Sequence, residues 1–251
     1  DAQESRGLGD VYKRQAYHLP QAISFKSALR LGRGQSIKPL QVGHDDVAVL
    51  QYTGGTTGLA KGAMLTHGNL VANMQQARAC LGQHGPDGHT QWREGQEVMI
   101  APLPLYHIYA FTANCMCMMV TGNHNVLITN PRDIGGFIKE LKKWRFSALL
   151  GLNTLFVALM DHPDFKNLDF SNLKLTNSGG TALVKATAER WQKLTGCRIT
   201  EGYGLTETSP VACTNPYGER SRLGTVGLPV PGTTLKTVSY THLTLPTIYS
   251  V

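Results

Sequence analysis

Six short apolar runs recur along this 251-residue chain, and helical patterns lie between them. The runs are residues 47–52, 97–101, 125–129, 147–151, 174–178 and 198–201. Each run has the length of a buried strand. Residues 133–144 carry apolar side chains at helical spacing behind Asp133, which can cap the helix start, and Thr66 precedes a second such pattern. Strands that alternate with helices in this way predict an α/β domain.

The longest stretch without a charged side chain covers residues 98–131. Prolines and asparagines interrupt it, and its cleanest apolar part, residues 108–120, is too short to span a bilayer. We therefore expect residues 108–120 to form a buried helix.

A loop crowded with glycines and hydroxyls, residues 52–62, lies between the first strand-like run and a helix-like one. Its four glycines let the backbone approach a polyanion closely. Thr53, Thr56 and Thr57 add hydroxyl donors, and Lys61 adds a mobile positive charge. This composition predicts a nucleotide phosphate as the ligand, and a flexible glycine linker is the alternative.

Two common nucleotide-binding loops do not match this segment. The Walker A pattern needs Gly before the Lys and Ser or Thr after it, whereas Ala60 precedes Lys61 and Gly62 follows it. The segment also lacks the Gly-x-Gly-x-x-Gly fingerprint of dinucleotide-binding folds. Neither Walker-type nor hydride-transfer chemistry is therefore indicated by this loop.

Four further motifs follow the loop in order. They are residues 102–108 (Pro-Leu-Pro-Leu-Tyr-His-Ile), 177–181 (Asn-Ser-Gly-Gly-Thr), 201–208 (Glu-Gly-Tyr-Gly-Leu-Thr-Glu-Thr) and 224–232 (Gly-Thr-Val-Gly-Leu-Pro-Val-Pro-Gly). Together with the loop they resemble the adenylate-forming superfamily, and within it the bacterial long-chain fatty acid:CoA ligases. The resemblance runs from about residue 16 to about residue 238.

The resemblance implies part of the large N-terminal domain of the adenylate-forming fold, with mixed sheets packed against helices and without the C-terminal lid domain. Residues 16–238 would form this partial AMP-binding domain. The two ends, residues 1–15 and 239–251, resemble translated sequencing-adapter DNA, and we expect them to be non-native. We also expect the chain to be a fragment of a longer product.

The resemblance also implies the cofactors ATP, Mg²⁺ and CoA. Thr53 and Glu207 would contact Mg²⁺, and Tyr203 would stack on adenine against the backbone of Gly179 and Gly180. The full set implied around the nucleotide is Tyr52, Thr53, Gly54, Gly55, Thr56, Thr57, Gly58, Lys61, Gly62, Gly179, Gly180, Thr181, Gly202, Tyr203 and Gly204.

Three residues are candidates for catalysis, namely Thr206, Glu207 and His107. By the resemblance, Thr206 reaches toward the α-phosphate and His107 orients the acyl carboxylate, which needs no deprotonation at neutral pH. From the residues alone, Glu207 also fits an exposed loop acid and His107 a buried core histidine. Phe111 lies four residues after His107, so on a helix it would face the same way and either gate an acyl tunnel or pack in the core.

Charge and cysteine usage favour a reducing, cytoplasmic location. The net charge is +7, but the Lys and Arg residues are scattered, which is typical of solvated faces rather than of a nucleic-acid site. The five cysteines show neither metal-ligand nor disulfide spacing. Weak attraction to anionic lipid remains compatible with these charges, so peripheral contact with the inner face of the membrane stays as an alternative.

By the resemblance, the parent enzyme activates a long-chain fatty acid with ATP and transfers the acyl group to CoA. Two alternatives stay open: a ligase for aryl or medium-chain acids, and a catalytically silent nucleotide- or acyl-binding fragment. We expect the chain itself to turn over poorly or not at all, because the family's catalytic lysine and ribose-binding aspartate lie beyond the fifth motif.

Overall fold

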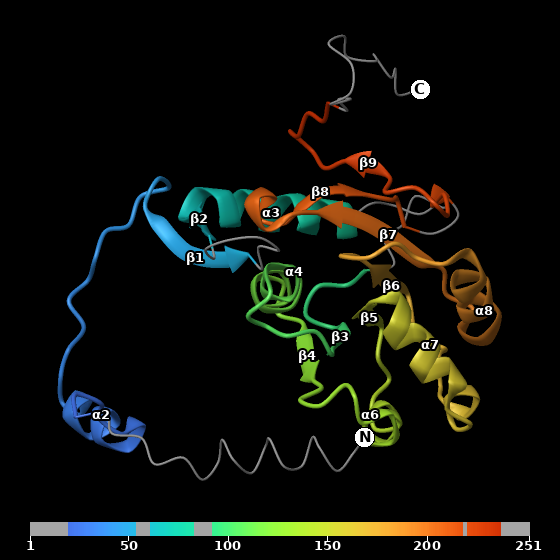
Figure 1. Ribbon diagram of the computed structural model, residues 1–251, viewed down its shortest axis with the longest axis horizontal. Helices are drawn as coiled ribbons and strands as arrows, with labels where there is room; N and C mark the ends of the chain where they lie inside the picture. Colours follow the sequence, from blue (N-terminus) through green and yellow to red (C-terminus); the bar gives the residue numbers. More distant parts are fainter. Residues whose placement is uncertain (1–19, 54–60, 83–91, 218–219, 237–251) are drawn as a thin grey trace. The chain divides into compact units, whose positions relative to one another are not determined.

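The computed structural model describes residues 20–53, 61–82, 92–217 and 220–236 (Figure 1). Both adapter-like ends lie outside these ranges. The chain divides into two compact units, residues 1–41 and 42–251. The first contains helix α2 (Phe25–Gly32), which begins at Ser24, whose hydroxyl accepts the N–H of Ser27 at 3.2 Å. All other described elements belong to the second unit.

The glycine loop joins the two strands of an antiparallel hairpin, β1 (Val47–Thr53) and β2 (Lys61–Thr66). The sequence predicted the helix that follows Thr66, but it did not predict a strand between the glycine loop and that helix. Residues 61–66 pair with β1 because alternate side chains, with Leu65 buried, suit a strand that is covered on one side. Helix α3 (His67–Leu81) then begins at the predicted cap: Thr66 Oγ1 accepts the N–H of Asn69 at 3.1 Å.

A seven-stranded mixed sheet forms the centre of the second unit, in the order β4-β3-β5-β6-β7-β8-β9. The first five strands in this order are parallel, and the last two are antiparallel. Their bounds are β3 (Val98–Ala101), β4 (His124–Leu127), β5 (Ala148–Gly151), β6 (Leu175–Ser178), β7 (Ile199–Gly204), β8 (Val211–Thr214) and β9 (Leu228–Pro229). All six predicted strands are present, whereas β2, β8 and β9 were not predicted.

Helices cover both faces of the sheet (Figure 1). On one face lie α6 (Ile134–Leu141), α7 (Asn153–Asp161), η2 (Phe165–Asn167) and α8 (Lys185–Thr195). On the other lie α3 and the consecutive segments α4 (Ile108–Ala110), η1 (Phe111–Cys117) and α5 (Met118–Val120). Leu149 of β5 packs into the first layer while its neighbours Ala148 and Leu150 pack into the second, as strand alternation requires.

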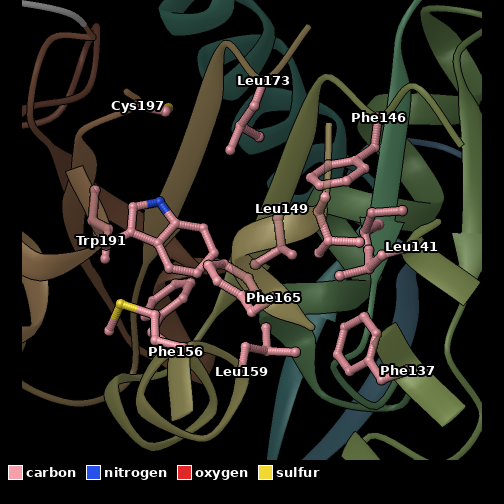
Figure 2. Close-up of a cluster of buried hydrophobic side chains, with 14 of the residues drawn as sticks. Phe137, Leu141, Phe146, Leu149, Phe156, Leu159, Phe165, Leu173, Trp191 and Cys197 are labelled. Carbon is pink, nitrogen blue, oxygen red and sulfur yellow. The ribbon is translucent and has the colours of Figure 1, made fainter. Parts of the chain in front are cut away.

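The larger core lies between the sheet and helices α6, α7 and α8 (Figure 2). Trp191 of α8 is fully buried there, with its ring centroid 4.9 Å from that of Phe156 and 5.3 Å from that of Phe165. Its Nε1 donates to Thr176 Oγ1 at 3.2 Å, so the polar edge of the ring is satisfied inside the core. This core holds the parallel strands in register and so fixes their carboxyl ends.

The predicted buried helix over residues 108–120 is confirmed, with one difference. Its middle, residues 111–117, has π-helical turns between two short α-helical pieces. Such turns occur often at functional sites, because the extra residue per turn redirects side chains. Within the described part of the chain, no helix is both long and apolar enough to cross a membrane.

Candidate active site

A cavity of about 410 Å³ opens in the second unit where the parallel strands β6 and β7 end. Residues from all five sequence motifs line it, the fifth through Val230. The ends of parallel strands are the position where open α/β sheets usually bind ligands. The predicted site residues that the structure brings together here are Thr53, His107, Gly179, Gly180, Gly202, Tyr203, Gly204, Thr206 and Glu207.

The remaining predicted residues fall into two groups. Tyr52, Lys61, Gly62 and Thr181 are described but are not among the residues that line the cavity. Tyr52 instead lies opposite Gly62 across the hairpin, where a Cβ on Gly62 would lie 3.6 Å from the tyrosine ring. The predictions for Gly54, Gly55, Thr56, Thr57 and Gly58 concern residues outside the described ranges.

The base of the glycine loop is held by Thr53, whose Oγ1 donates to the carbonyl oxygen of Lys61 at 3.3 Å. Thr53 is half-buried and lines the cavity, so the end of β1 lies at the site.

The turn that carries Thr206 and Glu207 is fixed by a hydrogen bond to Thr208 within the turn and by a second one from the helical segment η1. The N–H of Leu205 donates to Thr208 Oγ1 at 2.9 Å, which closes the short helix η3 (Thr206–Thr208). Thr112 of η1 donates its hydroxyl to the carbonyl oxygen of Ser209 at 3.2 Å. Thr206 is half-buried and Glu207 is exposed, and both line the cavity. Glu207 is thus a loop acid that also faces the site.

Two glycines at the ends of the strands permit this geometry. A Cβ on Gly204 would overlap the carbonyl oxygen of Pro210, because β7 and β8 approach closely there. Gly180 has a φ of +79°, which residues with a side chain rarely adopt. Both positions therefore need glycine for backbone reasons, independently of any ligand.

His107 lies at the start of α4, where its Nδ1 accepts the backbone N–H of Tyr109 at 3.2 Å. The residue is exposed and lines the cavity, so the alternative of a buried core histidine is wrong. Phe111 is not among the lining residues and packs beside Leu65, Leu70 and Ile108. Phe111 therefore packs in this cluster, and its role as a gate stays a prediction.

The fourth and fifth motifs are tied together at the sheet edge. The side-chain amide of Asn215 donates to the carbonyl oxygens of Thr225 at 2.6 Å and of Glu201 at 3.3 Å. Glu201 Oε1 accepts the N–H of Gly224 at 2.8 Å. These bonds hold residues 224–225 beside β7, although neither residue lines the cavity.

One end of the cavity is apolar. Its walls come from α3, from the sheet, from the helical segment 108–120 and from the segment that follows β8. The lining residues there are Ala77, Cys80, Leu81, Met99, Ala113, Cys117, Met118, Leu150, Leu175 and Tyr217. We call this end the apolar arm. The sequence predicted a buried helix here but not these contacts. The alternation of side chains along β3, β5 and β6 would have identified which residues face it.

Ionisable groups in the apolar arm are held in their neutral forms. Burial raises the pKa of the Tyr217 hydroxyl, and that of the Tyr109 hydroxyl beside the arm, far above the ordinary value. Burial also raises the pKa of the Cys117 thiol to about 11. Uncharged walls at neutral pH suit an apolar ligand group.

Tyr109 and Asn177 join the apolar arm to the glycine segment 179–180. The Tyr109 hydroxyl donates to Asn177 Oδ1, and Asn177 Nδ2 donates to the carbonyl oxygen of Thr200 at 3.0 Å. A Cβ on Gly179 would lie 3.3 Å from the Tyr109 ring, so the ring rests against that backbone. Asn177 belongs to the third motif, but neither residue was predicted as a site residue.

Comparison with known proteins agrees with the fold and the motifs. The sequence profile of the AMP-binding enzyme family matches residues 8–246. A long-chain-fatty-acid–CoA ligase of Salmonella typhimurium (strain LT2) is 52% identical over 223 residues. That alignment covers 88% of this chain but 38% of the relative, so the chain spans well under half the length of the protein that it matches.

Solved structures show the same fold. The structure of an anthranilate CoA ligase in complex with anthranoyl-AMP matches with a TM-score of 0.76 at 23% identity, covering 92% of this chain and 43% of that one. The structure of an ATP-bound chimera, RpMatB-BxBclM, matches with a TM-score of 0.65 at 30% identity, covering 82% of this chain and 38% of the other. With the family match over most of its length, the chain belongs to the AMP-binding enzyme family of adenylate-forming ligases.

Proposed function

We propose that this chain is the nucleotide- and acyl-binding part of a long-chain fatty acid:CoA ligase. The whole enzyme joins a fatty acid to AMP with release of pyrophosphate, and then transfers the acyl group to the thiol of CoA with release of AMP. Similarity to a curated long-chain-fatty-acid–CoA ligase supports this proposal. Because the chain spans 38% of that relative, the activity is proposed for the whole protein.

The observation that carries the proposal is the two-part lining of one cavity. Hydroxyls and glycine backbone line one end, and uncharged apolar side chains line the other. A nucleotide and an alkyl chain need these two environments side by side when they are joined in one acyl-adenylate. The cavity volume of about 410 Å³ lies in the range of small-molecule sites.

The residues at the polar end have roles that follow from their chemistry. The glycine loop and Thr53 supply amide and hydroxyl donors to phosphate oxygens, which offsets the repulsion between two anionic reactants. Tyr203 presents a half-exposed ring beside the glycine backbone, where an adenine base would stack. Thr206 provides a hydroxyl donor for the α-phosphate.

Thr53 and Glu207 fit a magnesium ion that is shared with the nucleotide. The described residues contain no cluster of three or more His, Cys, Asp or Glu side chains that could hold a metal alone. Magnesium commonly binds through one or two carboxylates together with substrate phosphates, and one carboxylate with one hydroxyl at the same cavity suits that pattern. When bound, the ion would neutralise charge on the phosphates.

His107 would orient the fatty acid carboxylate beside the α-phosphorus. A carboxylate oxygen then forms the new bond to phosphorus while the bond to the leaving pyrophosphate breaks. Because the carboxylate is already ionised at neutral pH, His107 acts here by positioning and not as a general base.

Two alternative functions predict different results. A ligase for aryl or medium-chain acids would share the polar end and differ in the apolar arm. A silent nucleotide- or acyl-binding fragment would bind the same acyl-adenylate analogues without forming acyl-CoA, so an assay of acyl-CoA synthesis distinguishes it.

The test is calorimetric titration of the folded chain with acyl-sulfamoyl adenosines, which are non-reactive analogues of the acyl-adenylate. Long-chain, short-chain and aromatic acyl groups are compared with adenosine sulfamate, which carries no acyl group. Tightest binding of the long-chain analogue supports the proposal. Preference for the aromatic analogue would favour an aryl ligase, and absence of all binding would contradict the assignment of the site to this chain.

A further inference from the structure

We propose that Asn177 is a positioning residue for acyl binding, which acts by holding the Tyr109 ring as a fixed wall between the polar end and the apolar arm. This inference rests on the proposed function of the site. Tyr109 lines the cavity and also packs with the cluster around Met99, Cys117 and Leu150. Its position therefore affects how an acyl chain passes from the adenylate into the apolar arm.

Two contacts fix the ring from different sides. The backbone at Gly179 lies against the ring, since a Cβ there would lie 3.3 Å from both Cε1 and Cζ. The hydroxyl at the far end of the ring donates to Asn177 Oδ1. Packing against one face leaves the ring free to tilt toward the open side, whereas a hydrogen bond at the hydroxyl removes that freedom.

Asn177 is itself held in one orientation. Its side chain is 9% exposed, and its Nδ2 donates to the carbonyl oxygen of Thr200 on the neighbouring strand β7 at 3.0 Å. Because the nitrogen must face this carbonyl, the oxygen must face Tyr109. The orientation of the ring is thus set by the pairing of β6 with β7, which also positions residues 202–204 in the cavity.

Ionisation of the Tyr109 hydroxyl does not take the place of this hydrogen bond. Burial raises the pKa of Tyr109 far above the ordinary value, so the hydroxyl stays protonated and keeps its donor. Without Asn177, the buried hydroxyl would lack the acceptor that it now has, and the ring would move to find another. A long acyl chain must displace a ring that samples positions inside the apolar arm. This displacement costs free energy and so weakens binding of the chain.

The test compares Tyr109→Phe, Asn177→Leu and the double variant in calorimetric titrations of the full chain. Tyr109→Phe keeps the ring and removes the hydroxyl. Asn177→Leu keeps the branched shape of the side chain and removes both the acceptor for Tyr109 and the donor to Thr200. The ligands are a long-chain acyl-sulfamoyl adenosine, a short-chain one and adenosine sulfamate. Tyr106→Phe is the matched control, since Tyr106 is exposed and is not among the cavity-lining residues.

We expect each single variant to weaken binding of the long-chain analogue about three- to tenfold, which is the typical net contribution of one hydrogen bond. Affinity for adenosine sulfamate and the short-chain analogue should change less than about twofold, and the double variant should be no weaker than either single variant. A general loss of structure would instead weaken the binding of all three ligands to a similar extent.

Three results would overturn the inference. The first is an unchanged ratio between the affinities for the long-chain and the short-chain analogue, and the second is a double variant in which the effects of the two substitutions simply add. The third is a loss of affinity for adenosine sulfamate as large as that for the long-chain analogue. If Asn177→Leu does not fold, Tyr109→Phe alone carries the test, because it keeps the packing against Gly179. If the unaltered chain binds adenosine sulfamate without preferring the long-chain analogue, the proposed function fails and this inference fails with it.

Discussion

Asn73 of α3 pairs both ends of its side-chain amide with the backbone of Val211 on β8, 138 residues away in the sequence. Its Nδ2 donates to the carbonyl oxygen at 2.7 Å, and its Oδ1 accepts the N–H at 3.0 Å. The side chain is 4% exposed, so these bonds replace water on both partners. Asn73 thereby acts as an extra strand partner for β8, next to the turn that carries Thr206 and Glu207.

We predict that Asn73→Leu lowers the free energy of unfolding by about 2–4 kcal/mol, because two buried backbone groups lose their partners. Urea unfolding followed by circular dichroism measures the change. Asn167→Ala, at an exposed position of η2, is the control and should stay within about 0.5 kcal/mol. Equal stability of the two variants would show that water replaces the Asn73 bonds without cost.

The ion pair between Glu97 and Lys174 gives a second prediction. The Glu97 side chain is 1% exposed, its Oε1 lies 2.7 Å from Lys174 Nζ, and the same oxygen accepts the N–H of Arg93 at 2.7 Å. Lys174→Met should lower the free energy of unfolding by about 3–5 kcal/mol, because a buried carboxylate loses a cationic partner. Adding Glu97→Gln should restore part of this loss, and a further additive loss in the double variant would contradict the argument.

Gly204→Ala should lower stability by about 1–3 kcal/mol, because the new methyl group meets the carbonyl oxygen of Pro210. Gly135→Ala in α6 is the matched control: its Cβ would meet only ordinary contacts with Asp133 and His162, and alanine favours the helix by up to about 1 kcal/mol. Thermal unfolding distinguishes the two. A stable Gly204→Ala chain would mean that β7 and β8 can separate without loss.

Alkaline pH should destabilise the fold through the Cys117 thiol. Its pKa is raised by burial from 9.0 to about 11, so the folded state holds the proton more tightly than the unfolded state. The contribution to stability is therefore complete below about pH 9 and is lost as the pH rises toward 11. The free energies of unfolding of the unaltered chain and of Cys117→Ala would be measured from about pH 8 to about pH 10.5, a range that covers much of the titration of the thiol. The two free energies should converge as the pH rises. Parallel curves would contradict this.

Glu207→Gln tests the proposed magnesium site. We expect magnesium to strengthen ATP binding by the unaltered chain, and this gain should fall about tenfold or more in the variant, as loss of a metal-oxygen contact typically does. Calorimetric titrations with and without Mg²⁺ measure the gain. Glu189→Gln, exposed on α8, should behave as the unaltered chain does. An equal gain in both variants would remove Glu207 from the site.

The strands were predictable from the sequence where they are buried on both faces. Residues 148–151 form a continuous apolar run because helices cover both sides of β5. By contrast, β2 begins with Lys61 and Gly62 and, among the described residues, pairs with β1 alone, so its local sequence does not mark it as a strand. The short antiparallel strands β8 and β9 depend on partners far away in the chain, such as Asn73, which local patterns do not reveal.

The polar end of the candidate site was predictable because its motifs are contiguous in the sequence. The apolar arm was not, since its walls come from single residues of several elements, such as Cys80 of α3 and Leu150 of β5. Asn177 was visible within a motif, but its bond to Tyr109 depends on a helix that begins 69 residues earlier in the chain, at Ile108. Contacts of this kind arise from the tertiary fold.

Strand β6 places successive side chains in different environments: Thr176 accepts the Trp191 Nε1 proton in the large core, and Asn177 faces Tyr109 at the cavity. Cavity lining and core packing are therefore divided between alternate positions of one strand. An engineer could alter residues 175 and 177 to reshape ligand preference while residue 176 continues to serve the core. A shift of the strand by one residue would lose both functions together, which restricts redesign of this pocket to substitutions and excludes insertions in β6.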